Sequence, residues 1–413
     1  MDTTDEKFAT RALAMTPRGS HTLSKRPAAI PFVGSHYVIS GDGATITTAD
    51  GSTYIDWIGG LGATPLGHNH PIIMAAVRLQ LTRGVSFSLP SVQEVITAEA
   101  LVPNIPCAEQ VRFLKTGSEA CSAAISIARA FTGREMILSD DIGYHGWHDQ
   151  FRVLAPTHPG VPDGLRKNIQ IFKYGDLDQL EQQLDEFRPA AVIMEPARLK
   201  TPPSSDYLPA IKRLATKYGA LLIFDEMILG GRHALAGGQE FFGVTPDLAT
   251  FGKAFGAGFP LAFVAGRAEI MAHAWPISGT FSGEAVSLAA CHAMLEIYAS
   301  EDIIGQLRDN GSRLQQAALA AGGVTVNGYP AHFSFTFTHH DQRTAASVLV
   351  QECAEQGVLF HPAVINSCAV MSVDQVTDSC DVLYEVLTKI DEMDPEQLVA
   401  ALRVAPYEDS VRR

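Results

Sequence analysis

The chain has 413 residues, of which 46% are hydrophobic and 18% are charged, and this composition excludes a disordered or fibrous protein. Its 31 Lys and Arg residues against 45 Asp and Glu residues give a formal net charge of −14. That sign argues against a nucleic-acid-binding protein and against docking on anionic lipid. The length suggests two or three domains. We expect neither an export signal nor a membrane span, because no stretch shows the required basic and apolar pattern.

The six cysteines are scattered and include no C-x-x-C pair. They are Cys107, Cys121, Cys291, Cys353, Cys368 and Cys380. This spacing favours buried free thiols in a reducing compartment, so we expect a cytoplasmic protein. A zinc site and a disulfide are the alternatives.

The first 60 or so residues are rich in turns and include a predicted hairpin. Residues 37–39 and 44–46 are strand-like and flank the turn from Ser40 to Gly43. A further strand-like stretch from Tyr54 to Trp57 follows Asp50 and Gly51. This region therefore does not share the pattern of the residues that follow it.

From about residue 111 onward, short apolar strands alternate with helices. We predict strands over 111–114, 136–138, 169–172, 190–194 and 220–224, and helices over 118–131, 177–187, 208–218 and 285–299. Ser118 is placed to cap the first of these helices, and Gly133 is placed to end it. Near-continuous apolar strands separated by helices indicate a mainly parallel sheet that is covered on both faces.

The last hundred residues read as α+β. We predict helices over 304–321, 344–356 and 376–390, and strands over 333–338 and 358–361. The fold class is therefore α/β, with a large central domain over residues 61–310. A smaller α+β domain is built from residues 1–60 and 311–413.

Two polar features of the large domain fall where predicted strands end, which is where open parallel sheets bind their ligands. The first is the segment from Lys115 to Ala120, whose small residues before a helix let backbone N–H groups close on an anion. A simple helix cap is the alternative interpretation. The second is Asp225-Glu226, which closes a wholly apolar strand and must have a partner, because an unpaired buried carboxylate is costly. A salt bridge would satisfy it, and a metal site lacks ligands at a suitable spacing.

Two further features carry a candidate nucleophile and a candidate stacking ring. Lys253 is the single lysine of a glycine-rich, otherwise uncharged stretch from Thr250 to Pro260. Desolvation lowers the pKa of a lysine and makes its neutral amine available as nucleophile and base. The segment from Gly143 to Asp149 holds an aromatic platform suited to a planar cofactor. His145 and His148 of this segment are the alternative, as metal ligands.

Together these features describe the needs of pyridoxal 5′-phosphate: a phosphate cradle, a stacking ring, an acid and a lysine. With them in place, the chain resembles the class III pyridoxal-phosphate-dependent aminotransferases of fold type I, and within them the glutamate-1-semialdehyde aminomutase-like branch. The resemblance covers nearly the whole chain. Its motifs are Asp50-Gly51 with Trp57, Leu66 to Pro71, Thr116 to Ala120, Tyr144 to Gly146, Glu195-Pro196, Phe224 to Glu226, Gly252-Lys253 and Gly279 to Phe281.

The resemblance implies a role for each matched residue. Lys253 would form the internal aldimine with the cofactor and move a proton between the substrate carbon and the cofactor. Asp225 would pair with the pyridinium nitrogen, so these two residues are the expected catalytic pair. Met227 would pack on one face of the ring, where the family usually has Val, and Tyr144 would stack on the other.

The phosphate would be held by two subunits, as the resemblance implies. Gly117 and Ser118 would bind it from one subunit, and Thr280 would reach it from the neighbouring subunit. The chain is therefore expected to form a homodimer with shared active sites. His68 and His70 would be structural, and no metal is expected.

The substrate is less clearly indicated. The aminomutase members of the family hold the substrate carboxylate with a segment that this chain replaces by Gly19 to Arg26. Candidate substrate contacts are Ser24, Arg26, Trp57 and Ser86. The family's frequent Ala-His-Thr near the C-terminus is also replaced, by Ala369 to Ser372 without a histidine.

These departures favour amino transfer between an amino donor and a ketone or aldehyde acceptor, of the oxo-sugar or semialdehyde type, in a ping-pong cycle. A glutamate-1-semialdehyde-type 2,1-aminomutase is the first alternative. A racemase, a decarboxylase or a lyase that uses the same cofactor is the second. A non-catalytic subunit that only binds the cofactor is the third.

Overall fold

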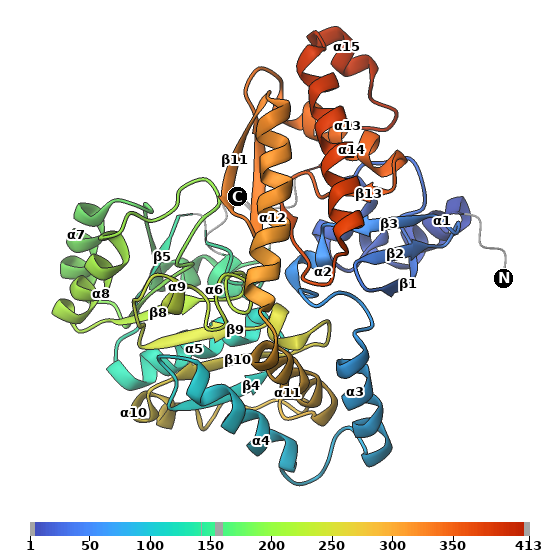
Figure 1. The fold of residues 1–413 in the computed structure, drawn as a ribbon. Helices are drawn as coiled ribbons and strands as arrows, with labels where there is room; N and C mark the ends of the chain where they lie inside the picture. Colours follow the sequence, from blue (N-terminus) through green and yellow to red (C-terminus); the bar gives the residue numbers. More distant parts are fainter. Residues whose placement is uncertain (1–4, 142, 153–159, 409–413) are drawn as a thin grey trace. The chain divides into compact units, whose positions relative to one another are not determined.

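The computed structural model describes residues 5–141, 143–152 and 160–408, and these form two compact units (Figure 1). Unit 1 is drawn from Met1–His70 and Gly305–Arg412, and unit 2 from Pro71–Ile304. The sequence-based limits of the large domain are 61 and 310, close to those of unit 2. Among the described helices, none combines the length and the apolarity needed to cross a bilayer.

Unit 2 is built on a seven-stranded sheet. In spatial order its strands are β4 (Gln110–Leu114), β10 (Ala262–Gly266), β9 (Leu248–Phe251), β8 (Leu221–Asp225), β7 (Ala191–Met194), β5 (Ile137–Asp140) and β6 (Ile169–Phe172). Neighbouring strands from β9 to β6 pair in parallel, with Ile223 opposite Ile193 in the β7–β8 pair. Strand β10 runs antiparallel to both of its neighbours. The sheet is thus mainly parallel, as predicted. Two of its strands, β9 and the reversed strand β10, were not predicted from the sequence.

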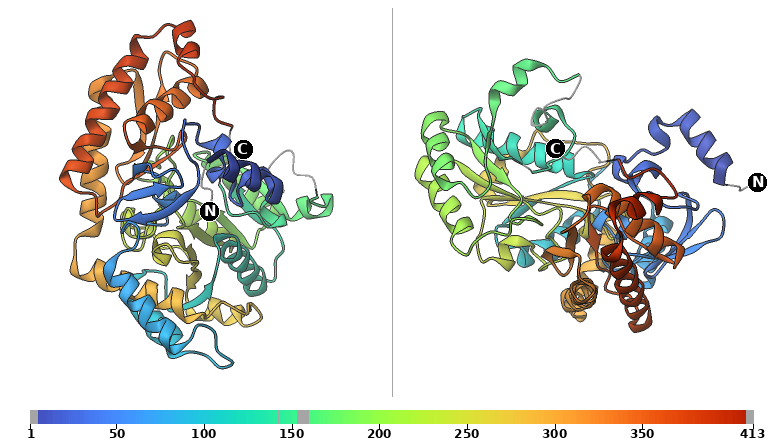
Figure 2. Two further views of the ribbon diagram at one scale, coloured as in Figure 1. Left: turned by 90° about the vertical axis from the view of Figure 1, so that its right-hand side faces the viewer. Right: turned by 90° about the horizontal axis from the view of Figure 1, so that it is seen from above.

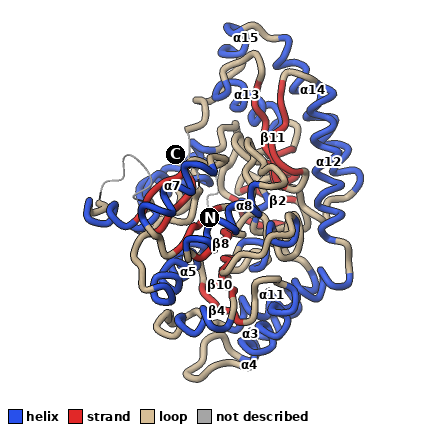
Figure 3. The backbone as a smooth tube through the Cα atoms, turned by 90° about the vertical axis from the view of Figure 1, so that its left-hand side faces the viewer, coloured by secondary structure: helices blue, strands red, loops and turns tan. Residues whose placement is uncertain are grey.

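Helices cover both faces of this sheet (Figure 3). Ile223 belongs to a core cluster with residues of α5 and α10, whereas its neighbour Leu222 belongs to a cluster with residues of α7 and α8. This alternation explains why the strands are apolar at every position. The helices of unit 2 are α3 (Pro71–Arg83), α4 (Val92–Leu101), α5 (Gly117–Thr132), α6 (Asp149–Arg152), α7 (Leu177–Phe187), α8 (Tyr207–Tyr218), α9 (Gly238–Phe241), α10 (Ala268–Met271) and α11 (Ala285–Ser300). Its 3-10 helices are η4 (Val102–Asn104), η5 (Asp163–Asn168), η6 (Lys253–Gly256) and η7 (Ala272–Ala274).

Helix α5 corrects one detail of the sequence analysis. Its N-cap is Thr116 and not Ser118, because the Thr116 hydroxyl accepts from Glu119 N and the Glu119 carboxylate reaches back to Thr116 N. This capping box leaves Ser118 inside the first turn. Gly133 ends the helix in the left-handed conformation, with φ of 68°, as expected.

Unit 1 holds two smaller sheets and a helical layer. One sheet orders β1 (Val38–Asp42), β2 (Thr45–Thr48), β3 (Thr53–Asp56) and β13 (Val358–Leu359), and the other orders β11 (Val324–Tyr329), β12 (His332–Phe337) and β14 (Ile365–Asn366). Its helices are α1 (Asp5–Met15), α2 (Gly59–Gly62), α12 (Ile303–Ala321), α13 (Gln342–Glu355), α14 (Val373–Glu392) and α15 (Pro395–Ala400), with 3-10 helices η1 (Pro17–Gly19), η2 (Leu23–Lys25) and η3 (Pro27–Ala29).

Chain segments from both termini share the core of unit 1. The parallel pair of β3 with β13 places Ile55 opposite Val358. Helix α13 packs on β13 and on α14, and Figure 2 shows these helices in orange and red. The predicted hairpin is present as the antiparallel pair β1–β2, but its turn is shorter than predicted: residues 40–42 belong to β1, and Asp42 pairs with Thr45.

Candidate active site

The carboxyl ends of the parallel strands of unit 2 bring together most of the predicted cofactor residues. Strand β8 ends at Asp225, and β9 ends two residues before Lys253. Strand β4, which runs in the same direction, leads through Lys115 and Thr116 into helix α5. Since parallel strands meet a ligand at this edge, the sheet order assembles segments that lie far apart in the sequence.

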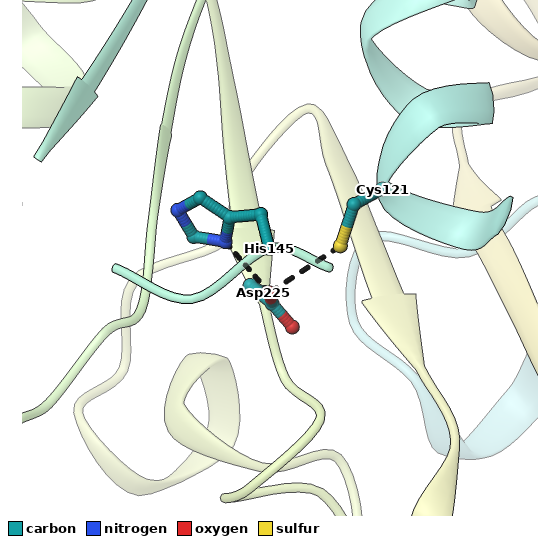
Figure 4. A group of neighbouring side chains, drawn as sticks. All are labelled: Cys121, His145 and Asp225. Atoms are coloured by element: carbon teal, nitrogen blue, oxygen red, sulfur yellow. Dashed lines mark hydrogen bonds and ion pairs between the residues drawn. The ribbon is translucent and has the colours of Figure 1, made fainter. Parts of the chain in front are cut away.

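The carboxylate of Asp225 is only 2% exposed and has four hydrogen-bond donors around it. Its Oδ2 accepts from His145 Nδ1 at 2.7 Å and from the Cys121 thiol at 3.3 Å (Figure 4). Its Oδ1 accepts from Met227 N at 3.1 Å and from Thr250 Oγ1 at 3.3 Å. These contacts orient the carboxylate and compensate its loss of water.

His145 is the charged partner of Asp225. Its side chain is fully buried, and its Nε2 lies 3.8 Å from Asp140 Oδ1 on the side away from Asp225. Burial opposes protonation of the imidazole, but Asp140 and Asp225 outweigh it and hold the pKa of His145 well above its usual value. His145 is therefore an imidazolium at neutral pH and donates from Nδ1 to Asp225.

Cys121, His145 and Asp225 also present three donor atoms within 4.8 Å of one another, as a metal site does. Two observations favour a hydrogen-bonded network over a metal site. Burial, together with the charge of Asp225, raises the pKa of the Cys121 thiol to about 12, whereas a metal binds the thiolate. The His145 nitrogen that faces this group carries a proton toward Asp225, so it has no lone pair for an ion.

The first turn of α5 has the features of an anion cradle. By helix geometry, the backbone N–H groups of Gly117 and Ser118 have no partner within the helix, and the dipole of a 16-residue helix favours negative charge there. The Ser118 hydroxyl accepts from Trp147 N at 3.1 Å, which ties the loop after β5 to this turn. Gly146 is required for that approach, because a Cβ there would lie 2.4 Å from Ser118 Oγ.

Met227 joins the cradle to the lysine segment. A Cβ built at Gly117 would lie 3.1 Å from the Met227 sulfur, and a Cβ at Gly252 would lie 2.8 Å from it. The thioether therefore packs between the two glycines. Lys253, which follows Gly252, has a positive φ of 45°, a strained conformation for a residue with a side chain and one that is common at functional sites.

One aromatic residue, Tyr144, and one acidic residue, Glu195, lie on the loops that follow β5 and β7. Tyr144 is half-exposed, and its backbone N–H donates to Glu195 Oε1 at 3.1 Å. Burial, together with the charge of Asp225, raises the pKa of Glu195. Tyr144 and Glu195 are thus held together after the ends of β5 and β7.

Thr280 lies on an exposed loop before helix α11. Glu284 caps this helix by accepting from Val286 N and Ser287 N. It also pairs with Lys115 Nζ at 2.9 Å. This ion pair links the loop of Thr280 to the end of β4, one residue before Thr116.

The four residues predicted to contact substrate have different settings. Ser86 is exposed in unit 2, between α3 and α4, and Ser24 is half-buried in unit 1. Trp57 is a correction: it is 0% exposed in the core of unit 1, and its indole N–H donates to Ser379 Oγ at 2.9 Å. A side chain with no exposed surface presents no face to a substrate.

The environment of Arg26 gives no support to a substrate contact either. Its guanidinium is buried and donates to the Leu23 carbonyl, and it pairs with Glu408 at 3.1 Å. Arg26 thus links the N-terminal and C-terminal segments of unit 1. Arg18, which also lies in the N-terminal segment, pairs with the same Glu408 carboxylate. We attribute a stabilising role to this cation.

Sequence reasoning missed the contacts of His145, Cys121 and Thr250 with Asp225. It also missed the ion pair of Arg198 with Asp140, whose Nη2 and Oδ2 lie 2.7 Å apart. One signal for His145 was present: the Asp225-Glu226 pair at the end of an apolar strand required a partner. The order of the strands, which the sequence did not specify, determines which residue that partner is.

The residues of this edge fit pyridoxal 5′-phosphate. The first turn of α5 suits a phosphate, and a buried, fully oriented carboxylate at Asp225 suits a protonated ring nitrogen. The α/β fold with its mainly parallel sheet and this set of groups defines a pyridoxal-phosphate enzyme of fold type I. Residues 33–390 match the family described as aminotransferase class-III, and the chain belongs to this family.

Solved structures agree with that assignment. The chain is 28% identical to an omega-transaminase from Sphaerobacter thermophilus, with a TM-score of 0.85 over 94% of this chain and 98% of that one. The FumI protein of Sphingopyxis sp. MTA144, in its PLP internal aldimine form, is 24% identical, with a TM-score of 0.88 over 96% and 99% of the two chains. A glutamate-1-semialdehyde aminomutase from Pseudomonas aeruginosa PAO1 is 20% identical, with a TM-score of 0.84 over 94% of each chain, and shows the shared fold.

The predicted family and fold are thus confirmed, and so is the prediction of a pyridoxal-phosphate-dependent aminotransferase. As an aminotransferase, the protein takes an amino donor and an oxo acceptor as substrates.

Proposed function

We propose that this aminotransferase moves an amino group to a ketone or aldehyde acceptor of the oxo-sugar or semialdehyde type, with Lys253 and Asp225 as its catalytic residues. These two residues are assigned because both lie at the carboxyl edge of the sheet. There Asp225 is buried with its donors in place, and β9, which pairs with β8 through Asp225 and Thr250, leads directly into Lys253.

Each residue of the site has a physical task in this proposal. The N–H groups of Gly117 and Ser118 bind the phosphate at the helix N-terminus. Met227 packs on one face of the ring, and Tyr144 stacks on the other. Asp225 accepts a hydrogen bond from the ring nitrogen. When bound, pyridoxal 5′-phosphate supplies an electron sink for negative charge that develops at the substrate carbon.

Lys253 both holds the cofactor and moves a proton. With the cofactor bound, its Nζ would take a proton from the substrate carbon and deliver the same proton to C4′ of the cofactor, which is general acid–base catalysis by a positioned amine. The strained backbone at Lys253 and the small residue before it set the direction from which its side chain leaves the strand. A rigid origin for the side chain favours this proton transfer, because misplacement of a catalytic group lowers the rate steeply.

A screen of half-reactions tests this function. Purified protein loaded with pyridoxal 5′-phosphate is mixed with single amino donors, and the absorbance of the bound cofactor is followed. We expect the band to shift with at least one donor and to return on addition of a matching ketone or aldehyde. Product formed without any acceptor would instead indicate an aminomutase, a racemase, a decarboxylase or a lyase.

We further propose that the protein is a homodimer with shared active sites. Large apolar side chains are exposed along one segment of unit 2 and on the loop of Thr280: Val85, Phe87, Leu89, Val92, Val95 and Phe281. The segment and the loop are neighbours, because Ala285 N donates to Val85 O at 3.0 Å and a Cβ at Gly283 would lie 2.4 Å from the Glu94 carboxyl carbon. An apolar surface of this extent supports contact with a second copy, which would carry Thr280 to the partner's site.

A complementation experiment tests the shared site. Lys253→Ala and Thr280→Glu protomers, each inactive alone, are unfolded, mixed and refolded together. If Lys253 and Thr280 of different subunits form one site, each mixed dimer regains one intact site, and about a quarter of wild-type activity returns. No recovery in a mixture that light scattering shows to contain dimers would contradict sharing. A monomer by light scattering would contradict the dimer itself.

We retain a cytoplasmic location as a proposal. All six cysteines are free thiols, as in proteins of a reducing compartment. Burial raises the pKa of Cys121 and of Cys291 to about 12, which keeps both in the unreactive thiol form. Cell fractionation with an antibody to the protein tests this location.

A further inference from the structure

Behind Asp225, charged side chains continue into the interior in alternating sign. Asp225 meets His145, His145 faces Asp140, and Asp140 meets Arg198. The first three side chains are at most 1% exposed, and that of Arg198 is 9% exposed. The residues come from the ends of β8, β5 and β7 and from the loop after β5, so no single motif contains them.

The contacts in this chain of charges are of two kinds: His145 donates a hydrogen bond to Asp225, whereas Asp140 meets His145 and Arg198 as ion pairs without hydrogen-bond geometry. Arg198 Nη2 lies 2.7 Å from Asp140 Oδ2, and the guanidinium stacks on the Tyr174 ring at 4.7 Å from its centroid. Gly143 closes over the other carboxylate oxygen: a Cβ there would lie 2.1 Å from Asp140 Oδ1 and 2.5 Å from His145 Nε2. The loop therefore lies directly against both side chains, and any larger residue at position 143 would have to displace Asp140 or His145.

The sum of the charges shows what the pair of Asp140 and Arg198 does. Asp225, His145, Asp140 and Arg198 sum to zero when all four are ionised. Removing the charge of Asp140 alone leaves two buried cations, His145 and Arg198, with a single anion. Loss of the His145 proton is then the change that costs the least free energy. A neutral His145 gives the Asp225 carboxylate a weaker hydrogen bond than an imidazolium does, because a bond from a charged donor is the stronger one.

We propose that Asp140 and Arg198 are positioning residues for this aminotransferase: as a buried ion pair they hold His145 as a cation, and the Nδ1–H of His145 holds the Asp225 carboxylate in the direction of the ring nitrogen. The inference rests on the proposed role of Asp225. It adds two residues that touch neither substrate nor cofactor.

The electrostatics of the groups around His145 support this assignment. Burial of Asp140 opposes its ionisation, but His145 and Arg198 outweigh that and lower its pKa. Besides Asp140 and Asp225, the groups that act on His145 are the Cys121 thiol on α5 and Glu195 after β7. Burial raises the pKa of the Cys121 thiol to about 12, which keeps it neutral at neutral pH, and burial together with the charge of Asp225 raises the pKa of Glu195.

The test measures the pKa of His145 in the full-length protein, with and without bound pyridoxal 5′-phosphate. Protein labelled with ¹³C in its histidine rings is titrated by NMR, and the His145 signal is assigned by its loss in His145→Gln. In the wild type we expect no titration of this signal between pH 6 and pH 8. In Asp140→Asn we expect the pKa of His145 to fall by at least about one unit, into the neutral range.

The double variant Asp140→Asn/Arg198→Met separates charge from packing. It also removes the cation left unpaired by Asp140→Asn, so we expect the pKa of His145 to rise again relative to the single variant. A merely structural pair would show no such rescue, because a second lost contact only adds damage. Lys212→Met is the matched control: it breaks the Lys212–Asp247 ion pair, 2.7 Å long, at the other end of the sheet, and we expect the pKa of His145 to stay unchanged.

The outcomes separate this inference from the proposed function. A wild-type His145 that titrates in the neutral range, or an Asp140→Asn variant that leaves it unmoved, would overturn the inference even if the protein binds pyridoxal 5′-phosphate normally. A wild-type protein that fails to bind the cofactor would contradict the proposed function, while the titration of the cofactor-free protein still tests the ion pair. If Asp140→Asn does not fold, the comparison of Arg198→Met with Arg198→Lys decides. We expect Arg198→Lys to keep the wild-type titration, and Arg198→Met to add one titrating proton to the cluster.

Discussion

The two ends of the seven-stranded sheet treat buried charge in different ways. At the amino end, Asp247 precedes β9, accepts from Leu222 N at 2.8 Å and pairs with Lys212 at 2.7 Å and with Arg267 at 3.5 Å. The two cations are 30% and 45% exposed, so water shares in the interaction. At the carboxyl end, Asp225 and its charged neighbours are sealed from water.

This difference in exposure distinguishes ion pairs that stabilise the fold from charges that orient a functional group. A partly exposed ion pair holds a strand end in place and contributes modestly to stability. A buried chain of alternating charges costs free energy to desolvate and is weak evidence for stability, yet it holds the Asp225 carboxylate in a fixed direction. The contrast indicates that the carboxyl end is organised for the cofactor and the amino end for the fold.

The largest expected effect comes from removing one carboxylate charge at each end of the sheet. Asp225→Asn should lower kcat/KM by about 10²- to 10³-fold, since it removes a preorganised charge from the reacting group. Asp247→Asn should leave kcat/KM unchanged and lower the melting temperature, by about 2–4 °C for each kcal/mol lost. Steady-state kinetics and calorimetry on both variants check the contrast. Equal losses of activity in Asp225→Asn and Asp247→Asn would contradict the contrast between the two ends of the sheet.

A second prediction concerns stability against pH in the cofactor-free protein. The folded state keeps the His145 proton above 6.5, where the unfolded chain has lost it, so the free energy of unfolding should fall as pH rises from 6.5. Glu226 acts in the same direction, because burial raises its pKa to about 8. Below 6.5, His233 acts in the opposite direction, since burial and the charge of Arg232 lower its pKa to about 3.

Urea unfolding at several pH values between 6.5 and 9 measures this slope. In His145→Gln the slope should be shallower, with the contribution of Glu226 remaining. Lys212→Met is again the control, and its slope should equal that of the wild type. A stability that rises between pH 6.5 and pH 8 would contradict the charge assigned to His145.

The smallest expected effect lies in unit 1 and concerns Arg26. If this cation only fastens the chain ends, Arg26→Met lowers the melting temperature by a few degrees and leaves the KM of both substrates unchanged. Arg18→Met is the matched control, because it removes an exposed partner of the same Glu408 carboxylate and should change little. A large rise in the KM of one substrate in Arg26→Met would restore the substrate contact expected from the sequence.

The elements themselves were largely predictable from the sequence. Helix α7 has the predicted bounds of 177 and 187, because an amphipathic run lies between an Asp cap and a following proline. Strands β9 and β10 were missed because apolar runs of four and five residues beside glycines carry little periodicity. The N-cap of α5 was misplaced by two residues because Thr116 and Ser118 are both suitable caps, and only the reciprocal bond with Glu119 distinguishes them.

The site was predictable where a residue acts through its own segment. Lys253 and Asp225 stand out because each is unusual among its neighbours in the sequence. The roles of His145, Asp140 and Arg198 depend on strand order, which places β5 and β7 beside β8. The settings of Trp57 and Arg26 depend on partners more than 300 residues away, Ser379 and Glu408, and no local pattern indicates such pairs.

The most direct test of the account is to locate the lysine that holds the cofactor. Purified protein is loaded with pyridoxal 5′-phosphate, the covalent linkage is reduced with borohydride, and the modified peptide is identified by mass spectrometry. We expect a pyridoxyl group on Lys253 and none in Lys253→Ala treated in the same way. A group found on another lysine, or unchanged labelling of Lys253→Ala, would contradict it.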